Sequence, residues 1–251
     1  MEFDGVRALD GVSLEVAPGE LFAVIGPNGA GKTSLFNVVS GFYRPSRGRV
    51  VLDGRELAEQ PPHQIAQLGV ARSFQNLELF PLMTTLENLL VGRHQQFRST
   101  WWSDGLWTGR ARREEVRHRA RVEEIMDFLD LEAYRWQRVS SLPYGVQKRI
   151  ELGRALAMEP SILLLDEPTA GMNLEETEDV ARYILDIHEE LGITEVLVEH
   201  DMGVVMDLAD RVAVLNFGRC IDQGTPAEVQ RSDAVVEAYL GAGRTPAEKG
   251  R

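Results

Sequence analysis

The chain has 251 residues, of which 43% are hydrophobic and 26% charged, as in an ordinary soluble globular protein. Its formal net charge of −12 argues against non-specific binding to nucleic acid, because the phosphates would repel it. Its one cysteine, Cys220, excludes an internal disulfide and fits a reducing compartment. No apolar run approaches the roughly 20 residues that span a bilayer, and the N-terminus shows no signal pattern, so we expect any membrane role to depend on a partner.

The first part of the chain predicts short strands around one helix. Alternating residues predict a half-buried strand at 12–16 (VSLEV), and an apolar run predicts a buried strand at 21–25 (LFAVI). A helix is predicted at 33–40, ending at Gly41. The Asp53-Gly54 pair predicts a hairpin turn between two strands.

Helical periodicity then dominates from about 76 to 140, above all at 114–131, before strands and helices alternate again. The later elements are a strand at 162–166 (ILLLD), a helix at 180–191, and strands at 195–200 and 211–216. This alternation indicates a mostly parallel sheet with helices on both faces, into which the helical block is inserted. Glu195 opens a strand that should be apolar, and the sequence offers no reason for it.

The sequence GPNGAGKT at 26–33 fits the pattern G-x-x-x-x-G-K-[ST] and lies between an apolar strand and a helix. Gly29 and Gly31 let the backbone curl so that its N–H groups point at phosphate oxygens, and the helix dipole adds positive potential. Lys32 can contact the β- and γ-phosphates, and the Thr33 hydroxyl can bind Mg²⁺. A dinucleotide-binding loop is excluded because the glycine spacing differs and a Lys-Thr pair follows.

Two carboxylates, Asp166 and Glu167, follow the buried strand at 162–166. Ligands of open α/β sheets bind at the carboxyl ends of the strands. There Asp166 can hold Mg²⁺ and Glu167 can polarise an attacking water. Together with the phosphate loop, these residues indicate that the protein binds and hydrolyses a nucleoside triphosphate.

The helix predicted at 145–157 begins in an unusual way, with Pro, Tyr and Gly in the stretch LPYGVQKRIELGRALA. Its first turn offers unpaired N–H groups and the positive end of a helix dipole, which suits a γ-phosphate. Because the phosphate loop already serves the nucleotide of its own chain, this second anion site is available to another molecule's nucleotide. The pattern therefore predicts a dimer with ATP between the subunits.

The order of these motifs resembles that of ATP-binding cassette (ABC) ATPases. In chain order they are GPNGAGKT, Gln75 within ARSFQ, LPYGVQKR, ILLLDEP, and His200 within VEHD. The stretches at 31–50, 71–92 and 142–157 and the ending VVEAYLG are most similar to the ATPase subunits of bacterial branched-chain amino acid importers. The resemblance covers nearly the whole chain.

The resemblance implies an α/β fold with the P-loop NTPase core of a mostly parallel sheet and helices on both faces, a small antiparallel β subdomain and an inserted helical subdomain. We expect one ABC ATPase domain over 1–251. Its RecA-like core and antiparallel β subdomain would comprise 1–75 and 155–241, the helical subdomain with the signature motif 76–154, and a disordered tail 242–251.

The resemblance also implies a role for each matching site residue. Glu167 would be the general base, His200 would contact the γ-phosphate, and Gln75 would touch Mg²⁺ or the attacking water. Mg²⁺ would be held by Thr33, Gln75 and Asp166. ATP would be bound by Phe3 (stacked on adenine), Gly26, Pro27, Asn28, Gly29, Ala30, Gly31, Lys32, Thr33, Ser34, Tyr144, Gly145 and Val146.

The signature motif departs from the usual Leu-Ser-Gly-Gly-Gln of the family. Pro143 replaces the Ser, Tyr144 a Gly, and Val146 the Gln. Backbone N–H groups around Gly145 must then make the γ-phosphate contact. Asn173, in the loop at 170–173 that matches a dimer contact, stands where Asp is common.

The implied function is that of a transport ATPase subunit, peripheral on the cytoplasmic face of the cell membrane. ATP would close a homodimer, or a heterodimer with a paralogous subunit, and closure would pull on integral membrane permease subunits through residues 76–81. An extracytoplasmic substrate-binding protein would be an indirect partner, and nucleic acid would not be one. Leucine, isoleucine and valine are the implied cargo, with urea, short amides or other amino acids left open.

Two other functions remain as alternatives. A soluble ABC ATPase of repair or translation usually carries two cassettes or a long coiled-coil insertion, and neither is present. A non-hydrolysing regulator is opposed by the intact Glu167. The Trp-rich stretch 98–110 is either an internal anchor or a surface for a permease or lipid headgroups, and the six arginines of 110–121 are either a solvated face or membrane-facing cations.

Overall fold

The computed structural model describes residues 2–3, 6–73, 78–96 and 109–241. Gln75, the Trp-rich stretch up to residue 108 and the tail 242–251 lie outside these ranges, so the expectations about them stay predictions. Among the described helices, none combines the length and the apolar sequence that crossing a membrane needs.

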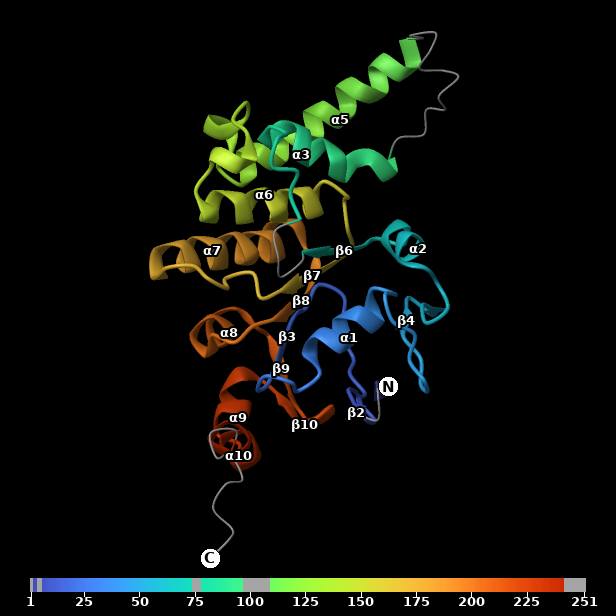
Figure 1. Cartoon of the computed structure of the whole chain (residues 1–251), viewed down its shortest axis with the longest axis vertical. Helices are drawn as coiled ribbons and strands as arrows, with labels where there is room; N and C mark the ends of the chain where they lie inside the picture. Colours follow the sequence, from blue (N-terminus) through green and yellow to red (C-terminus); the bar gives the residue numbers. More distant parts are fainter. Residues whose placement is uncertain (1, 4–5, 74–77, 97–108, 242–251) are drawn as a thin grey trace, which may run out of the picture.

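A six-stranded sheet forms the centre of the fold, in the order β10-β9-β3-β8-β7-β6 (Figure 1). Its inner strands pair in parallel, and only β10 runs antiparallel, beside β9. The strands are β3 (Leu21–Ile25), β6 (Val70–Ser73), β7 (Ile162–Asp166), β8 (Thr194–Val198), β9 (Arg211–Asn216) and β10 (Arg219–Gly224). This sheet confirms the predicted α/β class.

Two small antiparallel pairs accompany the main sheet. They are β1 (Glu2–Phe3) with β2 (Val6–Arg7), and β4 (Val51–Leu52) with β5 (Arg55–Glu56). The second pair turns at Asp53-Gly54, and both of these residues have positive φ angles (47° and 77°). A two-residue turn with positive φ at both positions matches the right-handed twist of a hairpin, as the sequence predicted.

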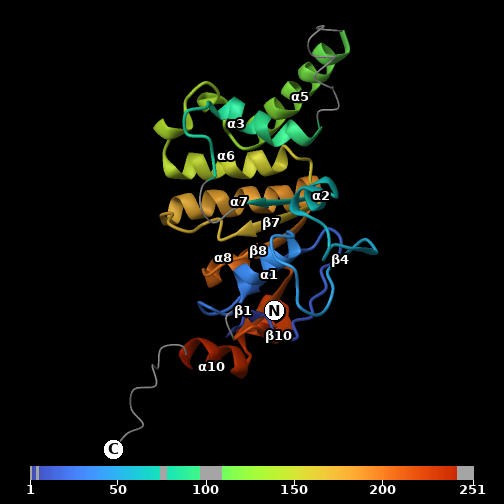
Figure 2. The same ribbon diagram turned by 45° about the vertical axis from the view of Figure 1, so that its right-hand side comes forward.

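Helices cover both faces of the sheet (Figures 1 and 2). On β3 the side chains alternate, so that Leu21 and Ile25 join one buried cluster while Phe22 and Val24 join another. The helices are α1 (Lys32–Val39), α2 (Pro62–Gln67), α3 (Thr85–Gly92), α5 (Gly109–Phe128), α6 (Tyr144–Leu156), α7 (Leu174–Leu191), α8 (Met202–Leu208), α9 (Pro226–Gln230) and α10 (Asp233–Gly241), with short 3-10 turns η1 (Arg93–Gln96), η2 (Glu132–Tyr134) and η3 (Val139–Ser141). In both views α3, α5 and α6 gather at one end of the molecule, and α10 lies at the other.

The strand predicted at 12–16 is wrong, because the structure assigns no strand there. The alternation itself has a physical basis, since Val12, Leu14 and Val16 are partly buried against the second core cluster. The segment lies against the core without entering a ladder. Apolar alternation reports which side chains are buried, whereas a strand also needs a hydrogen-bonded neighbour.

Glu195 is a buried carboxylic acid within this sheet. It is fully buried on β8, in register with Leu21 of β3 and Leu163 of β7. Neither of its carboxyl oxygens has a hydrogen-bond partner in the part of the chain that the structure describes. Burial raises the pKa of Glu195 from its ordinary 4.5 to about 9. The side chain is therefore neutral in the folded protein at pH 7.

We expect Glu195→Gln to remove a pH dependence of stability. The pKa of Glu195 is raised in the folded state, so its contribution is fully present below pH 4.5 and is lost as the pH rises towards 9. Relative to the variant, the wild-type unfolding free energy should fall by about 1.4 kcal/mol per pH unit in this window. Urea unfolding at pH 5, 6.5 and 8 measures the difference, and a difference that stays constant with pH would contradict the assignment.

Candidate nucleotide site

The loop at 26–33 connects β3 to α1, and close backbone approaches explain two of its glycines. A side chain at Gly26, where φ is 148°, would place its Cβ 2.1 Å from the carbonyl oxygen of Leu215. At Gly31, where φ is 108°, a Cβ would lie 2.5 Å from the carbonyl oxygen of Ala8. Gly31 is also the N-cap of α1 and provides no side-chain cap. The first-turn N–H groups of α1 can therefore face an anionic ligand.

Lys32 lies in the first turn of α1 and is only 6% exposed. Its Nζ donates to the carbonyl oxygens of Gly26 (2.6 Å) and Pro27 (3.3 Å), so the ammonium group lies across the loop. Burial lowers the pKa of Lys32, while the nearby charges of Glu167 and Asp166 act in the opposite direction. A cation held this close to the loop suits a phosphate chain.

Asp166 ends β7 and is 2% exposed. Its Oδ2 accepts a hydrogen bond from Nη2 of Arg72 at 2.6 Å. Its Oδ1 is buried and has no hydrogen-bond partner among the described residues. A buried carboxylate oxygen without a partner needs a cation or a donor, and oxygen ligands suit Mg²⁺. The donor set of Asp166 and the exposed Thr33 therefore fits this metal, whose remaining ligands would come from the nucleotide and water.

Glu167 has a φ of 50°, in the left-handed region that non-glycine residues rarely adopt. Its Oε1 lies 2.5 Å from Nε2 of His200, which lies two residues after the end of β8, the strand next to β7. Strained backbone at a site rich in charge is typical of catalytic residues. The structure thus brings Lys32, Asp166, Glu167 and His200 together at the carboxyl ends of neighbouring strands.

Glu199 supports this arrangement, although no motif in the sequence selects it. Its Oε1 accepts hydrogen bonds from the N–H and hydroxyl of Thr169, and its Oε2 accepts one from the N–H of His200 at 2.8 Å. The side chain is 3% exposed. Glu199 therefore fixes the backbone on either side of the Glu167–His200 pair. Its position directly before His200 was the only available signal.

The predicted signature lies at the start of α6. Pro143 is its N-cap and makes no side-chain capping bond. Val146 packs into the core with 5% exposure, which leaves its backbone N–H as the group that could contact a phosphate. The Tyr144 hydroxyl donates to the carbonyl oxygen of Ala170 at 3.2 Å. The loop at 170–173 ends in Asn173, which forms a capping box with Glu176 at the start of α7.

The first turn of α6 and the phosphate loop belong to different layers of one chain. Phe36 of α1 packs in the second core cluster, whereas Val146 and Ile150 of α6 pack in the first. The sheet separates these two clusters, and α1 and α6 lie apart in both views (Figures 1 and 2). Within one chain, the first turn of α6 and the phosphate loop therefore lie on opposite sides of the sheet.

Phe3, the predicted adenine contact, lies on β1 opposite Val6 of β2. The chain continues from β2 to Ala8, whose carbonyl oxygen lies beside Gly31. The residue that follows the β1–β2 pair therefore packs against the phosphate loop. Gln75 lies outside the described residues, so its predicted place in the site stays a prediction.

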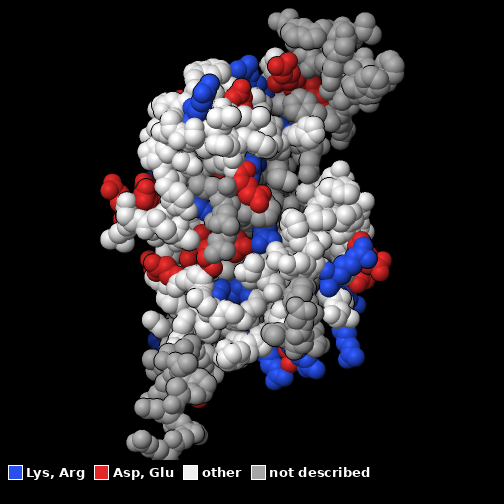
Figure 3. Space-filling view, in the orientation of Figure 1, with Lys and Arg blue, Asp and Glu red and all other residues white. Residues whose placement is uncertain are grey.

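Charges of both signs are distributed over the surface. On the face in Figure 3, acidic and basic side chains are interspersed, and no continuous basic area covers it. Affinity for a nucleic-acid backbone depends on an array of cations. The absence of nucleic acid among the partners stays a prediction from the net charge of −12.

Matches to two known protein families and to individual relatives agree with one another. Residues 9–170 match the family described as ABC transporter, and residues 223–245 match the one described as branched-chain amino acid ATP-binding cassette transporter. The chain is 41% identical over 241 residues to the high-affinity branched-chain amino acid transport ATP-binding protein LivG of Salmonella typhimurium, covering 96% of this chain and 94% of that protein. It is 39% identical over 241 residues to BraF of Pseudomonas aeruginosa, with the same coverage.

Solved structures show the same likeness in space. The ADP conformation of an ATP-binding cassette of an ABC transporter matches with a TM-score of 0.83 and 31% identity, covering 96% of this chain and 95% of that one. A dimeric cassette in a post-hydrolysis state, bound to ADP and Pi, matches with a TM-score of 0.74 and 26% identity, covering 90% of this chain and 94% of that one. Both likenesses extend well beyond the phosphate loop.

Proposed function

Because the chain belongs to the ATP-binding cassette family of transporter ATPases, we propose that it powers an importer of branched-chain amino acids. The proposed cargo rests on the similarity to LivG and BraF over 96% of the chain. The match of residues 223–245 to the branched-chain amino acid family supports it as well. This proposal replaces the soluble and regulatory alternatives. The cassette itself binds ATP and hydrolyses it, as its family does.

For the nucleotide we propose that ATP binds between two subunits. The loop from Gly26 to Ser34 and Lys32 would hold the phosphates from one side, and Phe3 would stack on the adenine. The first turn of α6, with Tyr144, Gly145 and the Val146 N–H, would close from the partner chain. The uncapped start of α6 and its separation from α1 within one chain support this arrangement.

For the chemistry we propose that Glu167 accepts a proton from the attacking water, while His200 contacts the γ-phosphate and orients the Glu167 carboxylate. The 2.5 Å contact between Glu167 Oε1 and His200 Nε2 supports this pairing. Thr33, Gln75 and Asp166 would hold Mg²⁺, which supplies positive charge for the phosphate oxygens when bound. Lys32 would neutralise charge on the β- and γ-phosphates.

From the family we propose the partners through which this chain would couple ATP hydrolysis to transport. Two copies, or one copy and a paralogue, would close on ATP and transmit that motion to permease subunits at the cytoplasmic face of the membrane. Residues 76–81 would receive the permease, and 76–154 would move as a helical subdomain relative to the core formed by 1–75 and 155–241. An extracytoplasmic binding protein would select the cargo. The dimeric relative bound to ADP and Pi supports the pairing of cassettes.

Uptake in the source organism tests the cargo. Deleting the gene is expected to reduce uptake of radiolabelled leucine, isoleucine and valine at least tenfold, and the wild-type gene should restore it. The Glu167→Gln gene should be expressed equally and restore nothing. Uptake that remains normal for these three amino acids but falls for urea or a short amide would overturn the cargo and keep the transport role. Unchanged uptake of every compound would overturn both.

A further inference from the structure

We propose that Arg72 is a positioning residue of the nucleotide site, which holds one oxygen of Asp166 so that the other is presented to the divalent cation. Arg72 lies on β6, three residues before Gln75, and none of the motifs selected it. The inference rests on the proposed role of Asp166 as a metal ligand. It adds the residue that sets the orientation of that carboxylate.

The guanidinium of Arg72 joins three elements of the site. Its Nη2 donates to Asp166 Oδ2 on β7 at 2.6 Å. Its Nη1 donates to Asn37 Oδ1 at 2.8 Å and to Ser40 Oγ at 3.1 Å, at the end of α1. The ring of Phe36, also on α1, lies 5.5 Å from the guanidinium carbon. One planar group therefore connects the helix that carries Thr33 to the strand that carries Asp166.

The buried contact with Arg72 involves only one of the two carboxylate oxygens of Asp166. The side chains of Arg72 and Asp166 are 8% and 2% exposed, so water cannot replace either partner. Arg72 occupies Oδ2, whereas Oδ1 is buried without a hydrogen-bond partner among the described residues. A carboxylate held at one oxygen in this way keeps its plane, which leaves Oδ1 as the oxygen available to a cation. Outer partners of metal ligands commonly act by fixing ligand orientation.

The position of Arg72 requires a guanidinium group, because its two terminal nitrogens bind partners on two different sides. Its two terminal nitrogens have different partners, Asp166 on one side and the pair Asn37 and Ser40 on the other. The ammonium group of a lysine is a point charge on a flexible stem and cannot hold both sides in one plane. Charge alone would therefore not replace Arg72.

The test measures metal dependence without turnover. Arg72→Met and Arg72→Lys are made in a Glu167→Gln background, and binding of trinitrophenyl-ATP is followed first in EDTA and then as MgCl₂ is added. Because ATP binds Mg²⁺ equally in every sample, differences between variants report the protein. We expect Arg72→Met to raise the half-saturating Mg²⁺ concentration by about 10- to 100-fold, the usual loss on removing such an outer partner. Nucleotide affinity in EDTA should change less than about threefold, since Arg72 does not touch the phosphate loop.

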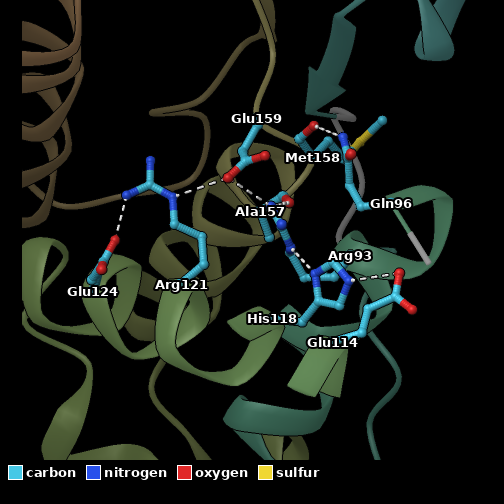
Figure 4. Close-up of polar contacts among 9 residues, drawn as sticks. All are labelled: Arg93, Gln96, Glu114, His118, Arg121, Glu124, Ala157, Met158 and Glu159. Carbon is cyan, nitrogen blue, oxygen red and sulfur yellow. Dashed lines mark hydrogen bonds and ion pairs between the residues drawn. The ribbon is translucent and has the colours of Figure 1, made fainter. Parts of the chain in front are cut away.

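A second buried arginine provides the matched control. Arg93 is 4% exposed and donates to the carbonyl oxygen of Ala157 and to His118 Nδ1, and it pairs with Glu159 at 3.1 Å (Figure 4). Like Arg72, it is less than 10% exposed at the side chain and pairs with a carboxylate, but it lies in the helical block between α3, α5 and the end of α6. Arg93→Met should lower the thermal midpoint and leave the half-saturating Mg²⁺ concentration unchanged.

Each outcome decides between distinct accounts. An unchanged Mg²⁺ requirement in Arg72→Met overturns the inference, and so does a lower one, which would mean that Arg72 competes with the metal. If Arg72→Met does not fold, Arg72→Lys decides alone: a requirement raised at least severalfold supports the inference, and a wild-type value overturns it. If the parent protein itself shows no Mg²⁺ dependence, the proposed metal role of Asp166 fails, and the inference fails with it.

Discussion

Glu167→Gln is expected to retain ATP binding and to hydrolyse ATP about 10²- to 10⁴-fold more slowly than the wild type. Glu167 is held in a left-handed conformation at the end of β7, and its Oε1 lies 2.5 Å from His200. Glutamine keeps the size of this side chain and one acceptor oxygen but cannot accept a proton from water. Only the chemical step should therefore be affected.

Phosphate release and nucleotide affinity, measured on the same preparation, separate these two effects. Glu124→Gln is a matched control, because Glu124 is an exposed carboxylate on α5 that pairs with Arg121. The control should hydrolyse ATP at the wild-type rate. Turnover near wild type in Glu167→Gln would remove Glu167 from the role of general base.

Lys32→Ala is expected to abolish tight ATP binding. The Lys32 ammonium group lies across the loop, 2.6 Å from the carbonyl oxygen of Gly26, where the phosphates would bind. Removing one partner from a buried, hydrogen-bonded charge pair costs about 2–5 kcal/mol. At about 1.4 kcal/mol for each tenfold change, affinity should fall by roughly 30- to 3,000-fold.

Isothermal titration calorimetry with ATP and Mg²⁺ measures this loss. Lys148→Ala is the control, because Lys148 is also buried but lies on α6 and pairs with Glu151 at 3.3 Å. It should cost stability and leave the affinity of the isolated subunit for ATP within a few-fold of wild type. Unchanged affinity in Lys32→Ala would count against the phosphate loop as the site of ATP.

Local patterns predicted the parts of the fold that depend on local chemistry. The apolar run before Asp166 forms β7, the Asp53-Gly54 turn closes the β4–β5 hairpin, and the loop at 26–33 lies between β3 and α1. Each feature is decided by residues within a few positions of one another. The sequence therefore sufficed to place Lys32, Asp166 and Glu167.

Long-range pairing accounts for what the sequence missed. The segment 12–16 has the apolar alternation of a strand but no ladder, whereas β10 has a polar sequence, RCIDQG, and pairs with β9 on both sides of a bulge between Cys220 and Asp222. The partner of a strand is set by tertiary packing and is not encoded in its own periodicity. Helix α7 likewise begins at Leu174, six residues before the predicted start, because the polar first turn carries no apolar periodicity.

The same limit applied to the site. Arg72 and Glu199 make their contacts with residues 94 and 30 positions away, at Asp166 and Thr169. An arginine in a short strand and a glutamate at a strand end have no spacing that identifies such partners. Their roles become visible only when β6, β7 and β8 are side by side.

The central claim is that two chains close around ATP, with the phosphate loop of one chain facing the first turn of α6 from the other. The most direct measurement is the mass of Glu167→Gln in solution with ATP and Mg²⁺, by light scattering after size-exclusion chromatography, with the bound nucleotide counted. If the partner is a second copy, the account predicts a dimer of the variant that carries two ATP molecules and separates when ATP is removed. If the partner is a paralogue, the same species should form only when that subunit is added. A variant that binds ATP but stays monomeric in both cases would contradict the account.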